Sequence, residues 1–541
     1  MLPGEILFLS LCLVYAAFSV LVGVKWLRVA QREHYIAGWT DKIARHWVSV
    51  RPTSWLPIVV AAVLGVASVY TPANLGWLTI LLWSVALFAS AWWPTGMGFR
   101  GRSSKLQWTP RARRLAGIWV FVWLVASWVG LAVMGPLTVA MFGWGFTMAG
   151  NTGGNIGVAI SIATALIVPA LLAPTVMDVA LIVAKPLEKA LSHKWLVAAQ
   201  KKLRQVNPTV VAVTGSYGKT STKGYIAHLV SAKYSVVPSP ASFNNLLGLS
   251  RAVNDKLTPG TEVFVAEMGV YGEGEIRELS KSFPPDIAAI TTIGESHLER
   301  MKSRAVILRA KSEIVENAKT VVLPIDDPDL AALAERCEAD GKRVIRVSAT
   351  GAKADVTVDP SKGTAAIGKE SVPVTISGVG HAVNVAVAIG IAHTLDVPLA
   401  VLAPRLLNLP TAAHRAEAQQ APSGAVIIDD SYNANPAGAA RAVEGGSALA
   451  AERKGPFIVV TPGMIELGRV QFDRNRALAE KIQSVGGELY VVGYTNRKAL
   501  LAGHSGATAF ADRPAAMAAA LDLAGAAGVI LVENDLPDHY A

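Results

Sequence analysis

The chain has 541 residues, of which 52% are hydrophobic, and it carries a formal net charge of +10. This length allows about three domains of ordinary size, and the apolar content argues against one compact water-soluble core. The two cysteines, Cys12 and Cys337, are too few and too distant for a disulfide framework or a zinc cluster, which fits a reducing compartment.

The first third of the chain differs in composition from the rest, because all fourteen tryptophans lie between Trp26 and Trp195. We interpret residues 1–184 as an α-helical transmembrane domain. Five apolar stretches there reach or approach the ~20 residues that a membrane-spanning helix needs. They are residues 6–24, 55–70, 75–93, 115–134 and 156–183, while the glycine-rich stretch 135–155 could be a re-entrant or interfacial element.

Basic residues predict the orientation of these spans. All twelve Lys and Arg residues before residue 185 fall in two segments, 25–51 and 100–114. By the positive-inside rule both segments face the cytoplasm, so the N-terminus lies outside and the chain after Lys185 lies inside. The expected location is a cell membrane, multi-pass, with the region after Lys185 in the cytoplasm. Asp178, in the last span, either contacts a substrate head group or is an ordinary carboxylate near the interface.

Residues 185–204 have the pattern of a basic juxtamembrane helix, which either meets anionic membrane lipids or is a solvated linker. The rest of the chain holds 32 of the 50 basic and 35 of the 40 acidic residues, so its charge is nearly balanced. No nucleic-acid partner is therefore predicted. The chain ends in ILVENDLPDHYA, an acidic and apolar tail to which the sequence assigns no role.

From residue 205, short β-branched runs alternate with helical patterns, which is typical of a parallel α/β sheet. A buried strand is predicted at residues 209–214, followed by a glycine loop and a helix. In such a loop, backbone N–H groups and the helix N-terminus bind phosphate oxygens, Lys219 reaches the β- and γ-phosphates, and Thr220 holds Mg²⁺. Val213 stands where the general pattern has another glycine. The predicted ATP-binding residues are Gly215, Ser216, Gly218, Lys219, Thr220 and Ser221.

The loop TGSYGKTSTK resembles the phosphate loop of the Mur ligases. Further blocks occur in the order which that family shows: SFNNLLGL (242–249), EMG (267–269), TTIGESHLE (291–299), AKSEI (310–314) and DDSYNANP (429–436). They look most like the branch of the family that adds D-alanyl-D-alanine to a nucleotide-linked muramoyl tripeptide. The resemblance implies an α/β P-loop central domain over residues 205–406 and a Rossmann-like α/β C-terminal domain over residues 407–541.

The resemblance also implies a magnesium site. Glu267 and His297 would be Mg²⁺ ligands beside the γ-phosphate, and Lys311 would take up CO₂ as a carbamate. Carbamylation turns a cation into an oxygen ligand of the kind that Mg²⁺ prefers. Taken singly, the three could instead be a strand-end acid, a helix cap and a surface charge. The expected catalytic residues are Lys219, Lys311 and His297, and the expected metal ligands are Thr220, Glu267, His297 and Lys311.

Other contacts implied by the resemblance concern the nucleotide and the two substrates. Arg415 would contact phosphate, and the loop that begins at Asp430 would close over nucleotide and amine. The expected substrate-binding residues are Asn244, Asn245, Tyr432, Asn433 and Asn435.

Several positions depart from the family pattern. Gly380 and His381 replace an expected His-Asn pair, and Pro324 replaces Asn, so contacts with the adenine base are in doubt. Pro462-Gly463 lacks the usual acidic residue, which leaves the amine substrate open. The family's soluble domain for the UDP-sugar is replaced by membrane segments.

The expected function is a membrane-anchored, ATP-dependent ligase. A carboxylate of a cell-wall precursor, nucleotide- or lipid-linked, would form an acyl phosphate, and an amino acid or D-Ala-D-Ala would then attack it to give an amide. Two alternatives remain from other classes of protein. One is a P-loop ATPase that drives transport through the spans, although the spans contain few charged positions that would support transport. The other is a non-catalytic scaffold that binds the precursor.

Overall fold

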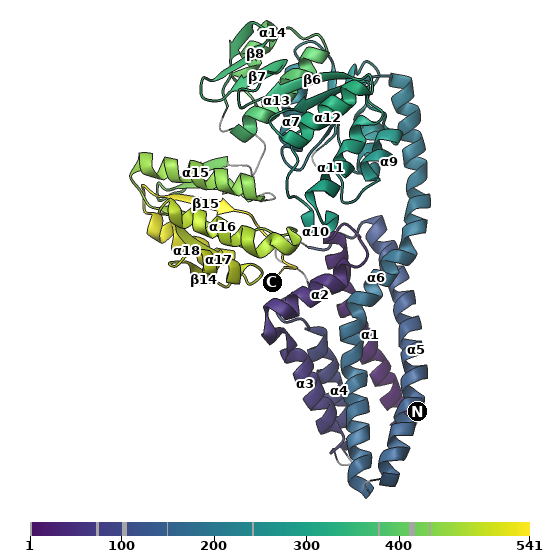
Figure 1. Ribbon diagram of the computed structural model, residues 1–541. Helices are drawn as coiled ribbons and strands as arrows, with labels where there is room; N and C mark the ends of the chain where they lie inside the picture. Colours follow the sequence, from purple (N-terminus) through teal and green to yellow (C-terminus); the bar gives the residue numbers. More distant parts are fainter. Residues whose placement is uncertain are drawn as a thin grey trace. The chain divides into compact units, whose positions relative to one another are not determined.

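The computed structural model describes residues 3–71, 75–99, 105–148, 150–240, 243–376, 379–410, 417–431 and 434–540. The chain forms two compact units. One comprises Met1–Leu191 together with Leu536–Ala541, and the other comprises Ser192–Asp535. Each unit has its own architecture (Figure 1).

The first unit is built from apolar helices, and all five predicted spans are helical. The described part of residues 135–155 forms the end of one long helix and the start of the next, rather than a separate re-entrant element. The helices are α1 (Pro3–Arg32), α2 (Trp39–Val50), η1 (Pro52–Trp55), α3 (Leu56–Ser68), α4 (Gly76–Ala91), α5 (Pro110–Met148) and α6 (Gly150–Val206), the last of which continues into the second unit.

The number of candidate spans differs from the prediction. Within the described residues, three helical stretches are long and apolar enough to cross a membrane, and the bent pair formed by α2 with η1 and α3 could be a fourth. Helices α3 and α4 have only 13 and 16 residues, fewer than the ~20 that a span needs. They form a hairpin in which the Trp83 indole donates to Ser68 Oγ at 2.8 Å. By length and composition, three or four stretches of the described residues thus qualify, and the predicted count of five spans stays a prediction.

Asp178 on α6 caps helix α2. Its two carboxylate oxygens accept hydrogen bonds from the backbone N–H groups of Thr40 (3.3 Å) and Asp41 (3.0 Å). Helix α2 follows Gly38, which supplies no side-chain cap, so the first N–H groups of the helix need an acceptor from elsewhere. A carboxylate also matches the positive end of the helix dipole. These contacts give Asp178 a structural role and favour it over contact with a substrate head group.

The second unit begins with the end of α6 and a nine-stranded sheet of order β2-β3-β1-β4-β5-β6-β7-β8-β9. Pairing is parallel from β2 to β7 and antiparallel for β8 and β9. The strands are β1 (Thr209–Thr214), β2 (Val236–Pro238), β3 (Val263–Glu267), β4 (Ile287–Ile290), β5 (Thr320–Pro324), β6 (Arg343–Ser348), β7 (Val356–Asp359), β8 (Thr364–Ile367) and β9 (Glu370–Pro373).

Both faces of this sheet are covered by helices. Along β1, Val210 and Ala212 belong to one hydrophobic cluster, and Val211 and Val213 belong to the other. Such alternation between two buried faces explains why the strands read as continuous apolar runs. The helices of this region are α7 (Lys219–Val230), α8 (Leu246–Lys256), α9 (Glu275–Ser282), α10 (Leu298–Met301), α11 (Arg304–Ser312), η3 (Glu313–Val315), α12 (Pro328–Ala339), α13 (Val379–Thr394) and α14 (Leu399–Leu406).

A second sheet, of order β10-β11-β15-β12-β13-β14, completes the second unit and is parallel except for the edge strand β10. It confirms an α/β region, whereas the Rossmann-like assignment stays a prediction. Its elements are β10 (Glu417–Gln420), β11 (Val426–Asp430), α15 (Pro436–Arg453), β12 (Phe457–Thr461), η4 (Gly468–Val470), α16 (Gln471–Ser484), β13 (Glu488–Val492), α17 (Arg497–Gly503), β14 (Thr508–Phe510), α18 (Arg513–Ala524) and β15 (Val529–Glu533).

Strand order decides where a ligand can enter the nine-stranded sheet. Strand β1 lies between β3 and β4. The connection after β1 runs to one side, to β2, whereas the connection after β3 crosses to the other side of β1, to β4. The loops after these strands separate at this point, and ligands of open parallel sheets bind beside the carboxyl ends of the strands at such a switch. The predicted phosphate loop follows β1 directly.

Candidate active site

The loop between β1 and α7 requires glycine at two positions. Gly215 and Gly218 have φ angles of 156° and 76°. A Cβ atom at Gly215 would lie 1.9 Å from Thr291 Oγ1, and one at Gly218 would lie 2.3 Å from Asn384 Oδ1. The backbone can therefore approach its neighbours only without side chains, and α7 begins immediately afterwards at Lys219. This strand, loop and helix arrangement is the one that cradles phosphate.

Two lysines converge on this loop. Lys219 Nζ donates to the Gly215 carbonyl oxygen at 2.7 Å, and Lys311 Nζ donates to the same oxygen at 3.1 Å. Lys311 is buried, and burial, aided by the charge of Lys219, lowers the pKa of its amine well below the usual value. Its neutral form, which is the nucleophilic form, is thus more populated than in an exposed lysine.

Glu267 forms a cluster of polar side chains at the end of β3. Its buried carboxylate accepts from Thr220 Oγ1 (3.0 Å), Lys223 Nζ (2.9 Å) and Asn244 Nδ2 (3.3 Å). The structure thus brings together three predicted residues: Glu267 from β3, Thr220 from α7 and Asn244 from the segment before α8. Sequence analysis missed Lys223, although it follows Lys219 by four residues and so lies on the same side of α7.

His297 is oriented by a residue that sequence analysis also missed. Its Nδ1 is hydrogen-bonded to Glu466, and its ring contacts Tyr271 edge to face with centroids 5.2 Å apart. Burial, and then the charges of Lys219 and Lys311, lower the pKa of His297, although Glu466 opposes this. The neutral imidazole therefore carries its proton on Nδ1, which leaves Nε2 as the acceptor or ligand atom.

Glu466 is correspondingly held as a carboxylate. Burial would raise its pKa, but the hydrogen bonds from His297 and Arg300, together with the charge of Arg300, outweigh burial and bring the pKa to about 2. Arg300 donates to the other carboxylate oxygen at 3.0 Å. Glu466 lies in the block TPGMIELG, in which the sequence analysis considered only the missing acidic residue at Pro462-Gly463.

The residues near the loop fit Mg²⁺ in their chemistry, because Thr220 and Glu267 offer hydroxyl and carboxylate oxygens beside a phosphate cradle. Within the described part of the chain, however, no three His, Cys, Asp or Glu side chains are grouped closely enough to hold a metal ion. The complete ligand set of Thr220, Glu267, His297 and Lys311 therefore stays a prediction. Carbamylation of Lys311 would add an oxygen ligand to this set.

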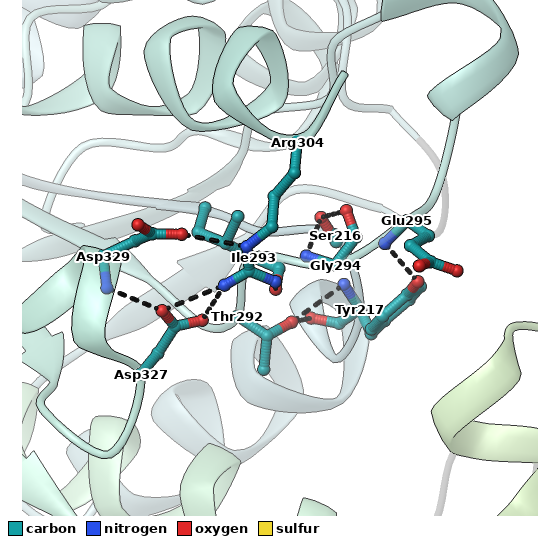
Figure 2. Close-up of polar contacts among 9 residues, drawn as sticks. All are labelled: Ser216, Tyr217, Thr292, Ile293, Gly294, Glu295, Arg304, Asp327 and Asp329. Carbon is teal, nitrogen blue, oxygen red and sulfur yellow. Dashed lines mark hydrogen bonds and ion pairs between the residues drawn. The ribbon is translucent and has the colours of Figure 1, made fainter. Parts of the chain in front are cut away.

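The loop after β4 holds the phosphate loop in place, as Figure 2 shows. Ser216 N donates to Thr292 O at 2.8 Å, and Gly294 N donates to Ser216 Oγ at 2.9 Å. Glu295 N donates to the Tyr217 hydroxyl at 2.8 Å, and burial chiefly raises the pKa of this phenol to about 12. Tyr217 is therefore a neutral clamp between the two loops.

Arg304 fixes the second loop in turn (Figure 2). It donates to Ile293 O at 2.8 Å and forms ion pairs with Asp327 and Asp329, each at 2.9 Å. The phosphate loop is thus supported from β4 through to the start of α12.

Replacing Gly294 by Ala is expected to disturb this clamp. The new Cβ atom would lie 2.2 Å from the Tyr217 ring, so the ring must move. Overpacking of this kind costs about 1–3 kcal/mol, and we expect a lower melting temperature together with weaker ATP binding. Thermal unfolding and nucleotide titration measure both. Gly272→Ala is the matched control, because a Cβ atom there meets nothing within 4 Å. Equal behaviour of the two variants would contradict the clamp.

Two predicted substrate residues cap helices. Asn245 accepts from Gly248 N at 2.9 Å at the start of α8, and Asn435 accepts from Gly438 N at 2.8 Å at the start of α15. Their roles in substrate binding stay predictions. Ser221 is buried in the first turn of α7. Arg415, Tyr432 and Asn433 lie outside the described residues.

Two further polar residues were not predicted. Asn384 on α13 is 7% exposed and faces Gly218, and its Oδ1 has no hydrogen-bond partner within the described residues. Glu533 pairs in register with Asp430 across β15 and β11, and burial, followed by the charge of Asp430, raises its pKa well above the usual value. Both residues lie where sequence reasoning saw only a departure from the family or an unassigned tail.

Comparison with known proteins places these features in a family. Residues 213–392 match the Mur ligase middle domain, and residues 414–533 match the Mur ligase, glutamate ligase domain. A UDP-N-acetylmuramoyl-tripeptide--D-alanyl-D-alanine ligase of Bacillus subtilis is 32% identical over 286 residues, covering 50% of this chain and 60% of that protein. The same-named ligase of Mycobacterium tuberculosis is 31% identical over 247 residues, covering 42% and 46%. The chain thus spans about half to three-fifths of these relatives.

Solved structures show the same fold. MurF from Thermotoga maritima in complex with ADP has a TM-score of 0.55 at 26% identity, with 64% of this chain and 80% of that chain covered. MurF from Acinetobacter baumannii has a TM-score of 0.56 at 24% identity, with 64% and 77% covered.

Proposed function

Because the chain belongs to the Mur ligase family, we propose that it is an ATP-dependent ligase that forms an amide bond through an acyl phosphate. The carrying observation is the convergence of Lys219 and Lys311 on the Gly215 carbonyl, beside the hydrogen bond between Thr220 and Glu267. Cations and oxygen ligands around a phosphate cradle suit phosphoryl transfer, which depends mainly on positioning and charge neutralisation.

Bound ATP would supply the γ-phosphoryl group that activates a substrate carboxylate, and Mg²⁺ would neutralise charge on the phosphates. Lys219 and the N-terminus of α7 would bind the phosphate oxygens. The neutral amine of Lys311 can add to CO₂ and release one proton to solvent, and the carbamate so formed would offer an oxygen ligand beside Thr220 and Glu267. His297, whose proton Glu466 fixes on Nδ1, presents Nε2 to the same site. An amine then displaces phosphate from the activated carboxyl carbon.

The names of the relatives suggest the substrates. We propose a UDP-linked muramoyl tripeptide as the carboxyl substrate and D-Ala-D-Ala as the amine. A lipid-linked precursor or a single amino acid is the alternative in each case. Because Pro462-Gly463 lacks the acidic residue usual in the family, the amine substrate is the variable to test.

We further propose that the first unit anchors the chain in the bacterial cell membrane, with the second unit in the cytoplasm, where ATP is available. Large apolar side chains point outward from its helices, including Leu13 (72% exposed), Phe121 (66%), Trp128 (71%) and Ile182 (61%). An apolar surface of this extent is costly in water and suits lipid.

The test uses the full-length protein in detergent with ATP and the UDP-linked tripeptide, and it follows phosphate release. We expect release that depends on D-Ala-D-Ala, with an amide product detected by mass spectrometry. Parallel reactions with single amino acids or a lipid-linked precursor identify the substrates. Release that ignores every amine would point to the transport-type ATPase, and precursor binding without release would point to the scaffold.

A further inference from the structure

The last residues of the chain belong to the helical unit. Strand β15 ends at Glu533 in the second unit, yet Leu536–Ala541 group with Met1–Leu191. The chain therefore leaves the helical unit after Leu191 and returns to it at Leu536. Neither the sequence pattern nor the proposed reaction accounts for this return.

The returning tail makes specific, buried contacts in the helical unit. His539 Nε2 lies 2.8 Å from Glu33 Oε1, with side chains only 1% and 6% exposed. Trp47 Nε1 donates to the His539 carbonyl oxygen at 2.6 Å. The Tyr540 ring meets His46 at a centroid distance of 6.1 Å and packs against the hydrophobic core of this unit. A backbone hydrogen bond, a side-chain hydrogen bond and a ring contact thus secure the consecutive residues His539 and Tyr540.

Burial makes these contacts selective. A polar side chain taken out of water is costly unless it meets a hydrogen-bond partner, and removal of one member of a buried hydrogen-bonded pair is destabilising. The hydrogen bond between His539 Nε2 and Glu33 Oε1 exists only when the tail is seated. Hydrogen bonds to Trp47 and Glu33, and not apolar burial alone, therefore fix the position of the tail.

The residues just before the tail are held in the second unit. Asp535 forms an ion pair with Arg513 at 2.9 Å, and Asn534 Nδ2 donates to Gly463 O at 2.6 Å. Only Leu536 and Pro537 separate Asp535 from Asp538, which lies 3.9 Å from Arg28 in the helical unit. Three residue steps span at most about 11 Å, so a seated tail limits the movement of the end of β15.

We propose that residues 536–540 form a docking strap whose receptor is the surface around Glu33 and Trp47, and that the strap restrains the sheet that carries Asp430. Together with the junction at Ser192, the strap attaches the second unit to the helical unit at both ends. The partner of this helical surface is thus a segment of the same chain. The strap goes beyond the proposed reaction and does not depend on it.

Docking can be measured in the full-length protein in detergent. In His539→Ala, release of C-terminal residues by a carboxypeptidase should be about 100-fold faster, because loss of a buried pair shifts the docking ratio by that order and cleavage follows the open population. Glu33→Ala, which removes the side-chain oxygens that face His539, should act likewise. The exchanged pair, Glu33→His with His539→Glu, should restore slow digestion. His193→Ala is the control, since His193 is an exposed histidine.

Restraint is read by hydrogen exchange at Ile530–Glu533, which should accelerate in His539→Ala and return to its original rate in the exchanged pair. Unchanged digestion in both single variants would overturn the docking, and faster digestion with unchanged exchange would overturn the restraint. Neither readout involves ATP or an amine, so failure of the strap is separate from failure of the ligase. The exchanged pair also distinguishes loss of docking from a general loss of folding.

Discussion

Lys219→Ala is expected to lower amine-dependent phosphate release about a thousandfold, which is the scale of losing one charge-stabilising group in a preorganised site. Lys219 is the first residue of α7, and its Nζ already lies at the phosphate loop, 2.7 Å from the Gly215 carbonyl oxygen. Lys311, which contacts the same oxygen, is a poor substitute for this charge, because burial and the charge of Lys219 lower the pKa of its amine.

The measurement is steady-state phosphate release with ATP titrated, together with a melting temperature to confirm folding. Lys281→Ala is the matched control, because Lys281 is exposed on α9 and lies outside the proposed site. Full activity in Lys219→Ala would mean that the reaction does not use this phosphate loop. A rise in KM with unchanged kcat would limit Lys219 to ground-state binding.

The parts of the site that sequence predicted are local. Strand, glycine loop and helix occupy residues 209–230, and their order along the chain predicted the phosphate loop. The structure adds the reason for Gly215 and Gly218, because a side chain there would meet Thr291 or Asn384. The alternation of apolar runs and helical patterns likewise predicted the parallel sheet. Helix lengths were less accessible, since the apolar stretches that contain α3 and α4 extend past the residues where these helices end.

The parts that sequence reasoning missed depend on distant partners. Glu466 lies 169 positions from His297, and His539 lies 506 positions from Glu33, so no short pattern joins them. Each is an ordinary charged or polar residue until the fold supplies its partner. Lys223 is different, because its helical spacing from Lys219 was readable, but its pairing with Glu267 required knowledge that β1 and β3 are neighbours.

Lys311→Ala is expected to lower turnover by about two to three orders of magnitude and to be partly rescued by short carboxylic acids. The reason is the environment of the amine. Lys311 is 2% exposed and adjacent to Lys219, and burial together with that charge favours its neutral form. A neutral amine reacts with CO₂, whereas an ammonium does not, so the lowered pKa of Lys311 favours formation of the carbamate. A free carboxylate in the space left by the side chain would restore an oxygen ligand.

The rescue separates a carbamate from a plain cation. If Lys311 acted through positive charge, added carboxylate would not help Lys311→Ala, and Lys311→Arg would retain activity. If it acts as a carbamate, Lys311→Arg is inactive, and depletion of CO₂ and bicarbonate lowers the activity of the unaltered protein but leaves the carboxylate-rescued variant unaffected. Lys319→Ala, a change at an exposed lysine eight positions along the chain, should leave all these rates unaltered. Unchanged turnover in Lys311→Ala would show that Lys311 takes no part in the reaction. The buried amine beside Lys219 would then have a structural role only.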